Sequence, residues 1–343
     1  MSDAGIPDLA RTHATLRFAF GVTLGLVASE LLQWAPTFLA PVFAGVLLVN
    51  VPIRPPIKVA VGFIAIIAAS ALIAMLLSTA LVRSPLILFG VSAVVVFRCL
   101  YVIAEGRSPV APLLLLICLT TIPVIALQSS AAAAAFAYAL VRAACLAVLI
   151  VWISYLLWPH VRPPGPRSPA APLPSDVRLR SALLGTAILT PLMLLYLMFG
   201  IADALPVLVA TTMIVVNLDF QRGRMQAVAL VAGNIGGGIA ALALILLLAI
   251  HRSLISLTLL TALLALAFGW KISAKDALAP ILLVACNAAL IVFTSTLLTD
   301  KGTLDVWVTR LMQFVVAGAF TVGMMTLLWP APDASKDLRG SRP

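Results

Sequence analysis

The sequence predicts an all-α membrane protein, with about twelve transmembrane helices in two parallel six-helix repeats. Three observations lead to this fold class. Of the 343 residues, 63% are hydrophobic and 10% are charged, and the mean hydropathy is +1.16, so there is too little polar surface to cover a soluble globule. The apolar residues gather in runs long enough to cross a bilayer. Similar runs recur on both sides of a long proline-rich segment.

The net charge of +10 would suggest a nucleic-acid partner in a soluble protein. Here the lysines and arginines stand in short segments between apolar runs, where they set membrane orientation, so no nucleic-acid partner is expected. The four cysteines lie inside apolar runs, with no pair at metal-ligand spacing. We therefore expect neither a disulfide framework nor a metal site, and no cofactor.

The first apolar run, 16–33, lacks a small-residue cleavage site and is followed at once by another run. This pattern indicates a retained span rather than a signal peptide. A hydropathy window of about 19 residues places the other spans of the first half. They are 36–52, 59–82, 85–104, 110–127 and 133–158.

Residues 159–180 contain seven prolines in twenty-two positions, a composition that cannot propagate a helix and predicts an extended spacer. Six more spans follow, at 181–200, 204–218, 226–250, 253–270, 277–298 and 307–329. The predicted organisation is a first repeat over 1–158, a cytoplasmic linker over 159–180, a second repeat over 181–330 and a cytoplasmic tail over 331–343.

The basic residues assign a side to each loop. With the N-terminus inside, sixteen of the twenty-two lysines and arginines fall in inner segments, three in outer loops and three within spans. The outer three are Arg83, Arg252 and Lys301. This bias predicts that both termini are cytoplasmic.

The two halves carry matching residues at matching places. The pairs are Pro112 with Pro280, Cys118 with Cys286, Arg107 with Lys275, Arg142 with Arg310 and Leu16-Arg17 with Leu179-Arg180. Both halves end in Leu-Leu-Trp-Pro, at 156–159 and 327–330. Because each half has an even number of spans, the repeats enter the membrane from the same side and are parallel.

Four stretches are distinctive: the opening Leu-Arg-Phe-Ala-Phe-Gly at 16–21, Leu39 to Phe43, Val51 to Arg54 and the glycine-rich 233–238. They resemble the fusaric acid resistance and aromatic acid exporter superfamily, and most closely a small uncharacterised branch of inner-membrane proteins. The resemblance extends over about residues 14 to 330. Larger relatives carry a soluble domain after each half, which the linker and tail here are too short to hold.

The resemblance implies a bacterial inner-membrane exporter of small aromatic or amphiphilic acids, driven by an ion gradient. It also implies coupling to a periplasmic membrane fusion protein. The residues themselves disfavour an enzyme, because there is no phosphate-binding Gly-x-x-x-x-Gly-Lys motif and the three histidines lie in loops or tails. The competing interpretation is a non-transporting assembly or scaffold subunit. A homo-oligomer is left open.

Charged residues inside spans are costly and tend to face a cavity or a partner, or to extend their head groups to the interface. The candidates for a substrate or proton path are therefore Glu30, Arg98, Arg142 and Arg310. Counted from the flanking tryptophans, Glu30 and Arg142 lie at one depth in a core of about 30 Å, which predicts an ion pair. Arg310 follows Trp307 by three residues and also fits an interface position.

Polar and proline positions complete the candidate path. Asn50 and Asn217 end the short spans and could bind a carboxylate or cap a helix, with capping favoured. Asp203 borders an outer loop, and Asn234 lies among glycines that suit close helix packing or local unwinding. Prolines at matched places predict helix breaks near the bilayer midplane, at Pro41, Pro112, Pro206 and Pro280.

Overall fold

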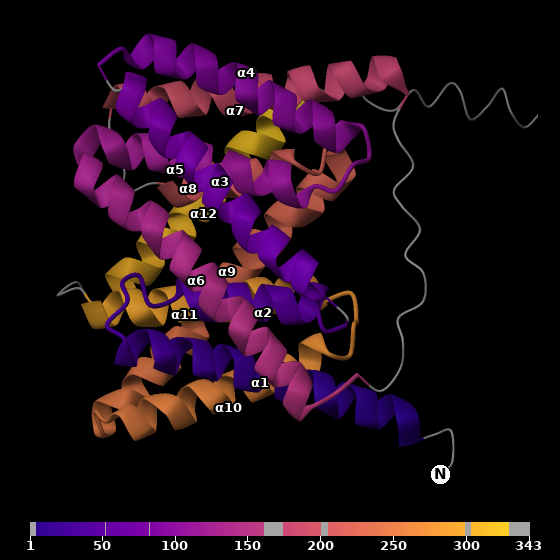
Figure 1. Cartoon of the computed structure of the whole chain (residues 1–343), viewed down its shortest axis with the longest axis vertical. Coiled ribbons are helices and arrows are strands. Elements are labelled where there is room, and N and C mark those ends of the chain that lie inside the picture. The colour runs from indigo at the N-terminus through magenta and orange to yellow at the C-terminus, as the bar shows by residue number, and fades with distance from the viewer. Residues whose placement is uncertain are drawn as a thin grey trace, which may run out of the picture.

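The computed structural model describes residues 5–51, 53–81, 83–160, 174–199, 205–298 and 303–328 (Figure 1). Within these ranges, all regular secondary structure is helical. The first six helices are α1 (Gly5–Leu31), α2 (Leu39–Asn50), α3 (Ile57–Leu81), α4 (Pro85–Ala104), α5 (Val110–Gln128) and α6 (Ser130–Leu157). The next six are α7 (Ser175–Phe199), α8 (Leu205–Val215), α9 (Phe220–Ile250), α10 (Leu254–Ile272), α11 (Ala279–Leu298) and α12 (Thr303–Leu328).

Ten of the helices in the described ranges are long and apolar enough to cross a bilayer, so the all-α prediction is confirmed and the chain is a multi-pass membrane protein. The other two, α2 and α8, have 12 and 11 residues. At a rise of 1.5 Å per residue they reach about 18 Å and 16 Å, short of a core of about 30 Å.

Several helices begin earlier than the apolar pattern predicts, three of them by six residues or more. Helix α1 begins at Gly5 rather than 16, α7 at Ser175, inside the predicted linker, rather than 181, and α9 at Phe220 rather than 226. Hydropathy locates only the part of a helix that lies in the bilayer core, and a helix continues past the interface as long as its backbone bonds are satisfied. Residues 161–173 of the linker and the tail 331–343 lie outside the described residues.

The hydrophobic cores combine helices from both halves of the sequence. One core contains Leu100 of α4, Leu119 of α5, Leu189 of α7 and Ile214 of α8. We call these four helices the upper lobe. A separate core contains Leu26 of α1, Leu257 of α10 and Phe293 of α11, with side chains of α2 packed against it. Helices α1, α2, α10 and α11 form the lower lobe.

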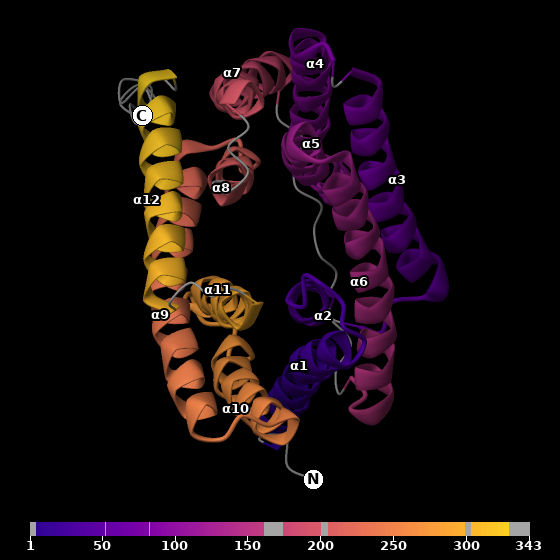
Figure 2. The same cartoon turned by 90° about the vertical axis from the view of Figure 1, so that its left-hand side faces the viewer.

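The long helices α3 and α6 join the two lobes on one side, and α9 and α12 join them on the other (Figure 2). Helix α9 takes part in both cores, since Leu230 lies in the upper core and Leu244 in the lower one. The two shortest helices, α2 and α8, face the interior between the lobes, where α2 contacts α11 and α8 contacts α5.

Corresponding helices of the two halves make corresponding contacts. Helix α3 packs on α5 and α6 as α9 packs on α11 and α12, and α2 packs on α6 as α8 packs on α12. Between the halves, α1 packs on α10 as α7 packs on α4. The first helix of each half therefore packs on the fourth helix of the other half.

Candidate functional site

Arg142 occupies the most distinctive polar environment among the predicted path residues. It lies half-buried on α6, and its Nη2 donates a hydrogen bond to the carbonyl oxygen of Ala35. The guanidinium carbon is 5.1 Å from the ring centroid of Trp34 and 5.4 Å from that of Tyr138. Tyr138 is 66% exposed, so one of the two rings is open to the surroundings of the protein.

The turn after α1 presents Trp34 and Ala35 to α6. Gln33 adopts a left-handed conformation with a φ of 53°. The amide of Trp34 bonds to the carbonyl of Ser29, and the amide of Gln33 bonds to that of Glu30. These are the two bonds of a Schellman C-cap, which satisfies the last carbonyls of α1 while turning the chain. Tyr138 precedes Arg142 by four residues on α6, so both side chains lie on one helix face.

This arrangement suits a planar aromatic anion. A guanidinium has five donors in a rigid fork that matches a carboxylate, and the Ala35 bond occupies one of them. An aromatic ring placed beside Trp34 or Tyr138 would gain apolar and stacking contacts while its carboxylate meets the cation.

The predicted ion pair between Glu30 and Arg142 does not form: both residues are described, and no oxygen of Glu30 lies within 4.0 Å of the arginine nitrogens. Glu30 is the penultimate residue of α1 and is half-buried. Similar depth in the membrane does not make Glu30 the partner of Arg142, because the Schellman turn places the Ala35 carbonyl and the Trp34 ring against the arginine instead.

The other two arginines have different surroundings. Arg98 is exposed near the end of α4, and its guanidinium carbon is 6.0 Å from the ring centroid of Tyr101. Arg310 is half-buried in the second turn of α12. The structure therefore places the candidate arginines on separate helices, and Arg142 lies between two aromatic rings.

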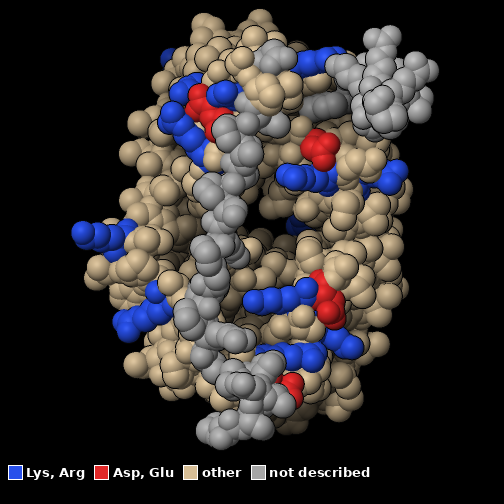
Figure 3. Space-filling model, turned by 90° about the vertical axis from the view of Figure 1, so that its right-hand side faces the viewer, with Lys and Arg blue, Asp and Glu red and all other residues tan. Residues whose placement is uncertain are grey.

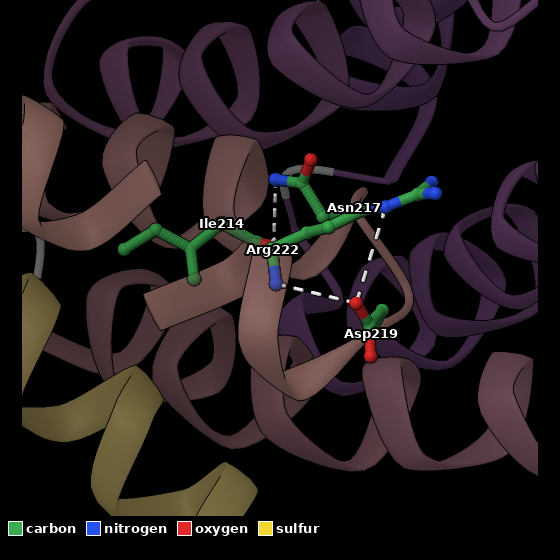
Figure 4. A network of polar contacts seen from close by, with 4 residues as sticks. All are labelled: Ile214, Asn217, Asp219 and Arg222. Atoms are coloured by element: carbon green, nitrogen blue, oxygen red, sulfur yellow. Dashed lines mark hydrogen bonds and ion pairs between the residues drawn. The ribbon is translucent and has the colours of Figure 1, made fainter. Parts of the chain in front are cut away.

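Asn50 and Asn217 both cap helices. The side-chain nitrogen of Asn50 donates to the Val46 carbonyl at 2.9 Å, and that of Asn217 donates to the Met213 and Ile214 carbonyls at 3.0 and 3.2 Å. In Figure 4 the Asn217 amide bonds back to α8. The capping interpretation therefore fits both residues, and both hold the last carbonyls of a short helix.

Asp219 starts the next helix beside Asn217. Its carboxylate accepts a hydrogen bond from the Arg222 amide at 3.3 Å and lies 4.0 Å from the Arg222 side chain (Figure 4). A side-chain acceptor at this position satisfies one of the free amides of the first helical turn. The turn between α8 and α9 is thus fixed from both sides.

The four prolines predicted to break helices stand at helix starts instead. Pro41 and Pro112 are the third residues of α2 and α5, and Pro206 and Pro280 are the second residues of α8 and α11. An amide in the first turn needs no intrahelical partner, so proline is tolerated there. The prolines inside described helices are Pro123 in α5 and Pro191 in α7.

Asn234 and its glycine neighbours pack helices together. The Asn234 side chain is 5% exposed and donates to the Leu230 carbonyl at 2.7 Å, within its own helix. A Cβ on Gly237 would lie 2.3 Å from the Ala285 carbonyl oxygen, so the absent side chain permits close contact of α9 with α11. The packing interpretation accounts for this segment. Asp203 lies outside the described residues.

Sequence reasoning missed the buried position of Arg17. This side chain is 6% exposed, donates from Nη1 to the Trp158 carbonyl at 2.9 Å and lies 4.6 Å from the ring centroid of Tyr155. The Tyr155 hydroxyl in turn donates to the Val51 carbonyl at 2.6 Å. The sequence did offer a signal, because Arg17 is directly followed by apolar residues. The assignment of lysines and arginines to membrane sides counted Arg17 as an inner loop residue and so overlooked it.

Among the described residues, no group of three or more His, Cys, Asp or Glu is placed to hold a metal ion. The four cysteines are free, with Cys145 exposed and the others buried.

The chain is similar to one family of known sequences over part of its length. Residues 14–154 match the model of a family described as "Protein of unknown function (DUF2955)". The match begins within α1 and ends within α6, so it covers α2 to α5 and most of α1 and α6. No curated protein matches the chain, and no solved structure matches it.

Proposed function

We propose that the protein is a secondary transporter that exports small organic anions, aromatic acids above all. The observation that carries the proposal is Arg142, a cation within a membrane span that lies between Trp34 and the exposed ring of Tyr138. Placing a charged side chain within a membrane span costs free energy, and in transporters such residues commonly belong to a substrate or ion pathway. The ring pair selects an aromatic group and the guanidinium selects a carboxylate.

The proposed architecture is two parallel six-helix repeats around a central pathway. It is supported by the matching helix contacts and by matching burial, since the six buried side-chain positions of α3 each have a buried counterpart 163 residues later in α9. The pairs are Ala60 with Gly223, Ile67 with Leu230, Ser70 with Gly233, Ala71 with Asn234, Ala74 with Gly237 and Ser78 with Ala241.

Helices α5 and α11 support the same symmetry with a spacing of 168 residues, which is that of Pro112 and Pro280. The buried pairs are Cys118 with Cys286, Thr120 with Ala288, Thr121 with Ala289, Ile122 with Leu290, Val124 with Val292 and Ala126 with Thr294. A parallel arrangement places the start of each half on one face of the membrane.

The proposed orientation has both termini in the cytoplasm of a bacterial cell, with the protein in the inner membrane. The face where α1 begins and α6 ends carries many lysines and arginines and is hollowed near its middle (Figure 3). A basic, hollowed face would draw an anion toward the space between the lobes. The proposal includes a periplasmic membrane fusion protein that receives the substrate on the opposite face.

The test is flux in proteoliposomes that contain the purified full chain. Labelled benzoate or salicylate should move when a pH gradient is imposed, and Arg142→Gln should lower the rate at least tenfold. Arg83→Gln is the matched control, because Arg83 is an exposed cation assigned to the same side and should not affect the rate. Absence of flux in the wild-type protein would favour the non-transporting scaffold instead.

A further inference from the structure

A cluster of cations lies where α1 begins and α10 ends. The guanidinium carbon of Arg11 is 4.1 Å from the ring centroid of Trp270, and its Nη2 donates to the Trp270 carbonyl at 3.1 Å. Lys271 follows in the last turn of α10, and Lys275 ends the next turn with a left-handed φ of 56°. Both lysine side chains are exposed.

The end of α6 brings further basic groups to this place. Nδ1 of His13 is 3.0 Å from the Pro159 carbonyl oxygen, and Arg17 donates to the neighbouring Trp158 carbonyl. His160 follows directly. Its imidazole pKa is lowered by partial burial and by the charges of Arg17 and Lys275, which places both cations close to it. The three chain segments therefore meet in one region of positive potential.

Among the described residues, Arg11, Lys271 and Lys275 form no ion pair. Asp8 and Asp276 are the nearest carboxylates in sequence, and neither lies within 4.0 Å of a nitrogen of Arg11, Lys271 or Lys275. The matching position in the first half differs: Arg107, the counterpart of Lys275, pairs with Glu105 at 3.0 Å. With the spacing of 168, the residue in place of Glu105 is Ser273.

An apolar surface leads up to the cluster along α10. Leu259, Leu263 and Leu266 are 65%, 63% and 38% exposed, and with Ile255 they follow one another at helical spacing toward Trp270. Trp270 is itself 45% exposed, and an indole at the end of a membrane helix marks the level of lipid head groups. Cations thus stand at head-group level above a surface that fits an acyl chain.

We propose that Arg11, Lys271 and Lys275 bind the phosphate of an anionic phospholipid whose acyl chain lies along α10. The lysines supply point charges, and Arg11, already positioned by the Trp270 ring, supplies remaining guanidinium donors. A bound lipid would link α1 of the first half to α10 of the second at the membrane surface. This inference does not depend on the transport proposal, because the ligand belongs to the bilayer.

The test is lipid binding to the delipidated full chain in detergent. Phosphatidylglycerol should bind saturably and raise the thermal denaturation midpoint, whereas phosphatidylcholine and inorganic phosphate should not. Each lysine near the membrane surface contributes about 1 kcal/mol to the binding of an anionic lipid, and 1.4 kcal/mol corresponds to a tenfold change in affinity. The double variant Lys271→Gln, Lys275→Gln should therefore bind phosphatidylglycerol about 25-fold more weakly than wild type. The charge-preserving variant Lys271→Arg, Lys275→Arg should bind like wild type.

The matched control is Arg107→Gln with Arg222→Gln, which removes two cations that carry their own acidic partners. It should keep wild-type affinity. An equal loss in this control would show that only total charge matters and would overturn the proposal. An equal shift with inorganic phosphate would assign the cluster to a soluble anion, and an equal shift with phosphatidylcholine would assign the effect to the apolar stripe, so either result would also overturn it.

Discussion

At the scale of residues, three arginines of the described chain are each positioned by a backbone carbonyl and an aromatic ring. Arg142 bonds to Ala35, Arg11 to Trp270 and Arg17 to Trp158, and each of these guanidinium groups also lies over a ring. In a membrane protein the carbonyls at helix ends have few other donors, so an arginine there stabilises both the cation and the helix end.

Arg17 offers a direct test of this role. In Arg17→Met the side chain keeps most of its apolar volume, but the Trp158 carbonyl loses the Arg17 donor, at a cost of about 1–3 kcal/mol. We expect a lower midpoint in thermal denaturation of the detergent-solubilised protein. The matched residue of the second half is Arg180, which is exposed, so Arg180→Met should change stability by less than about 0.5 kcal/mol. Equal midpoints for the two variants would contradict the assigned role.

The sequence selected Arg142, Asn50 and Asn217 from their positions in spans, and the structure gives each a specific environment. It could not predict the partners of these residues. The partner of Arg142 depends on how seven residues turn between α1 and α2, and hydropathy does not determine that turn. The proline prediction failed for a related reason, because a matched proline marks a helix start as readily as a helix break.

At the scale of elements, the apolar runs predicted every described helix, while helix starts were less accurate. The reason is physical: the pattern reports the bilayer core, and α1 and α7 extend beyond it. The glycine-rich segment of α9 was recognised as a packing motif with a competing unwinding role. It remains helical throughout, from Phe220 to Ile250.

Two neighbouring glycines of α9 make the packing role testable. In Gly237→Ala the new Cβ would lie 2.3 Å from the Ala285 oxygen and 2.9 Å from the Ala289 nitrogen, both backbone atoms of α11. The helices must separate, at a cost of about 1–3 kcal/mol. Gly236→Ala is the control, since its nearest contact would be the Ala285 Cβ at 3.9 Å and alanine favours the helix by up to about 1 kcal/mol. We expect the denaturation midpoint to fall in the first variant and to stay or rise in the second; the reverse order would exclude close α9–α11 packing.

At the scale of the whole molecule, the lobes do not coincide with the halves of the sequence. The prediction of 1–158 and 181–330 as separate units follows the repeat, but α1 packs on α10 and α4 on α7, across that division. Pairing between distant helices depends on side-chain fit along whole interfaces, and a single sequence does not reveal it. Each lobe therefore needs helices from both halves before its core is complete.

Crosslinking can test this exchange of helices. A Cβ on Gly269 of α10 would lie 3.5 Å from the Cβ of Phe18 on α1, within the range of about 3.5–4.5 Å that a disulfide requires. In a variant without the native cysteines and with a protease site in the linker, Phe18→Cys and Gly269→Cys should join under mild oxidation. After cleavage, the two halves should then migrate as one band on a non-reducing gel and as two bands after reduction.

The control combines Phe18→Cys with Gly185→Cys, which places the second cysteine in the upper lobe, where the contacts of Gly185 are Leu100, Val215 and Leu218. This pair should not crosslink, because α1 and α7 belong to different lobes with separate cores. If the control joined as efficiently as the test pair, or if the test pair joined only between molecules at high concentration, α1 would not pack on α10 within one chain. The lobe arrangement, and the pathway proposed between the lobes, would then be wrong.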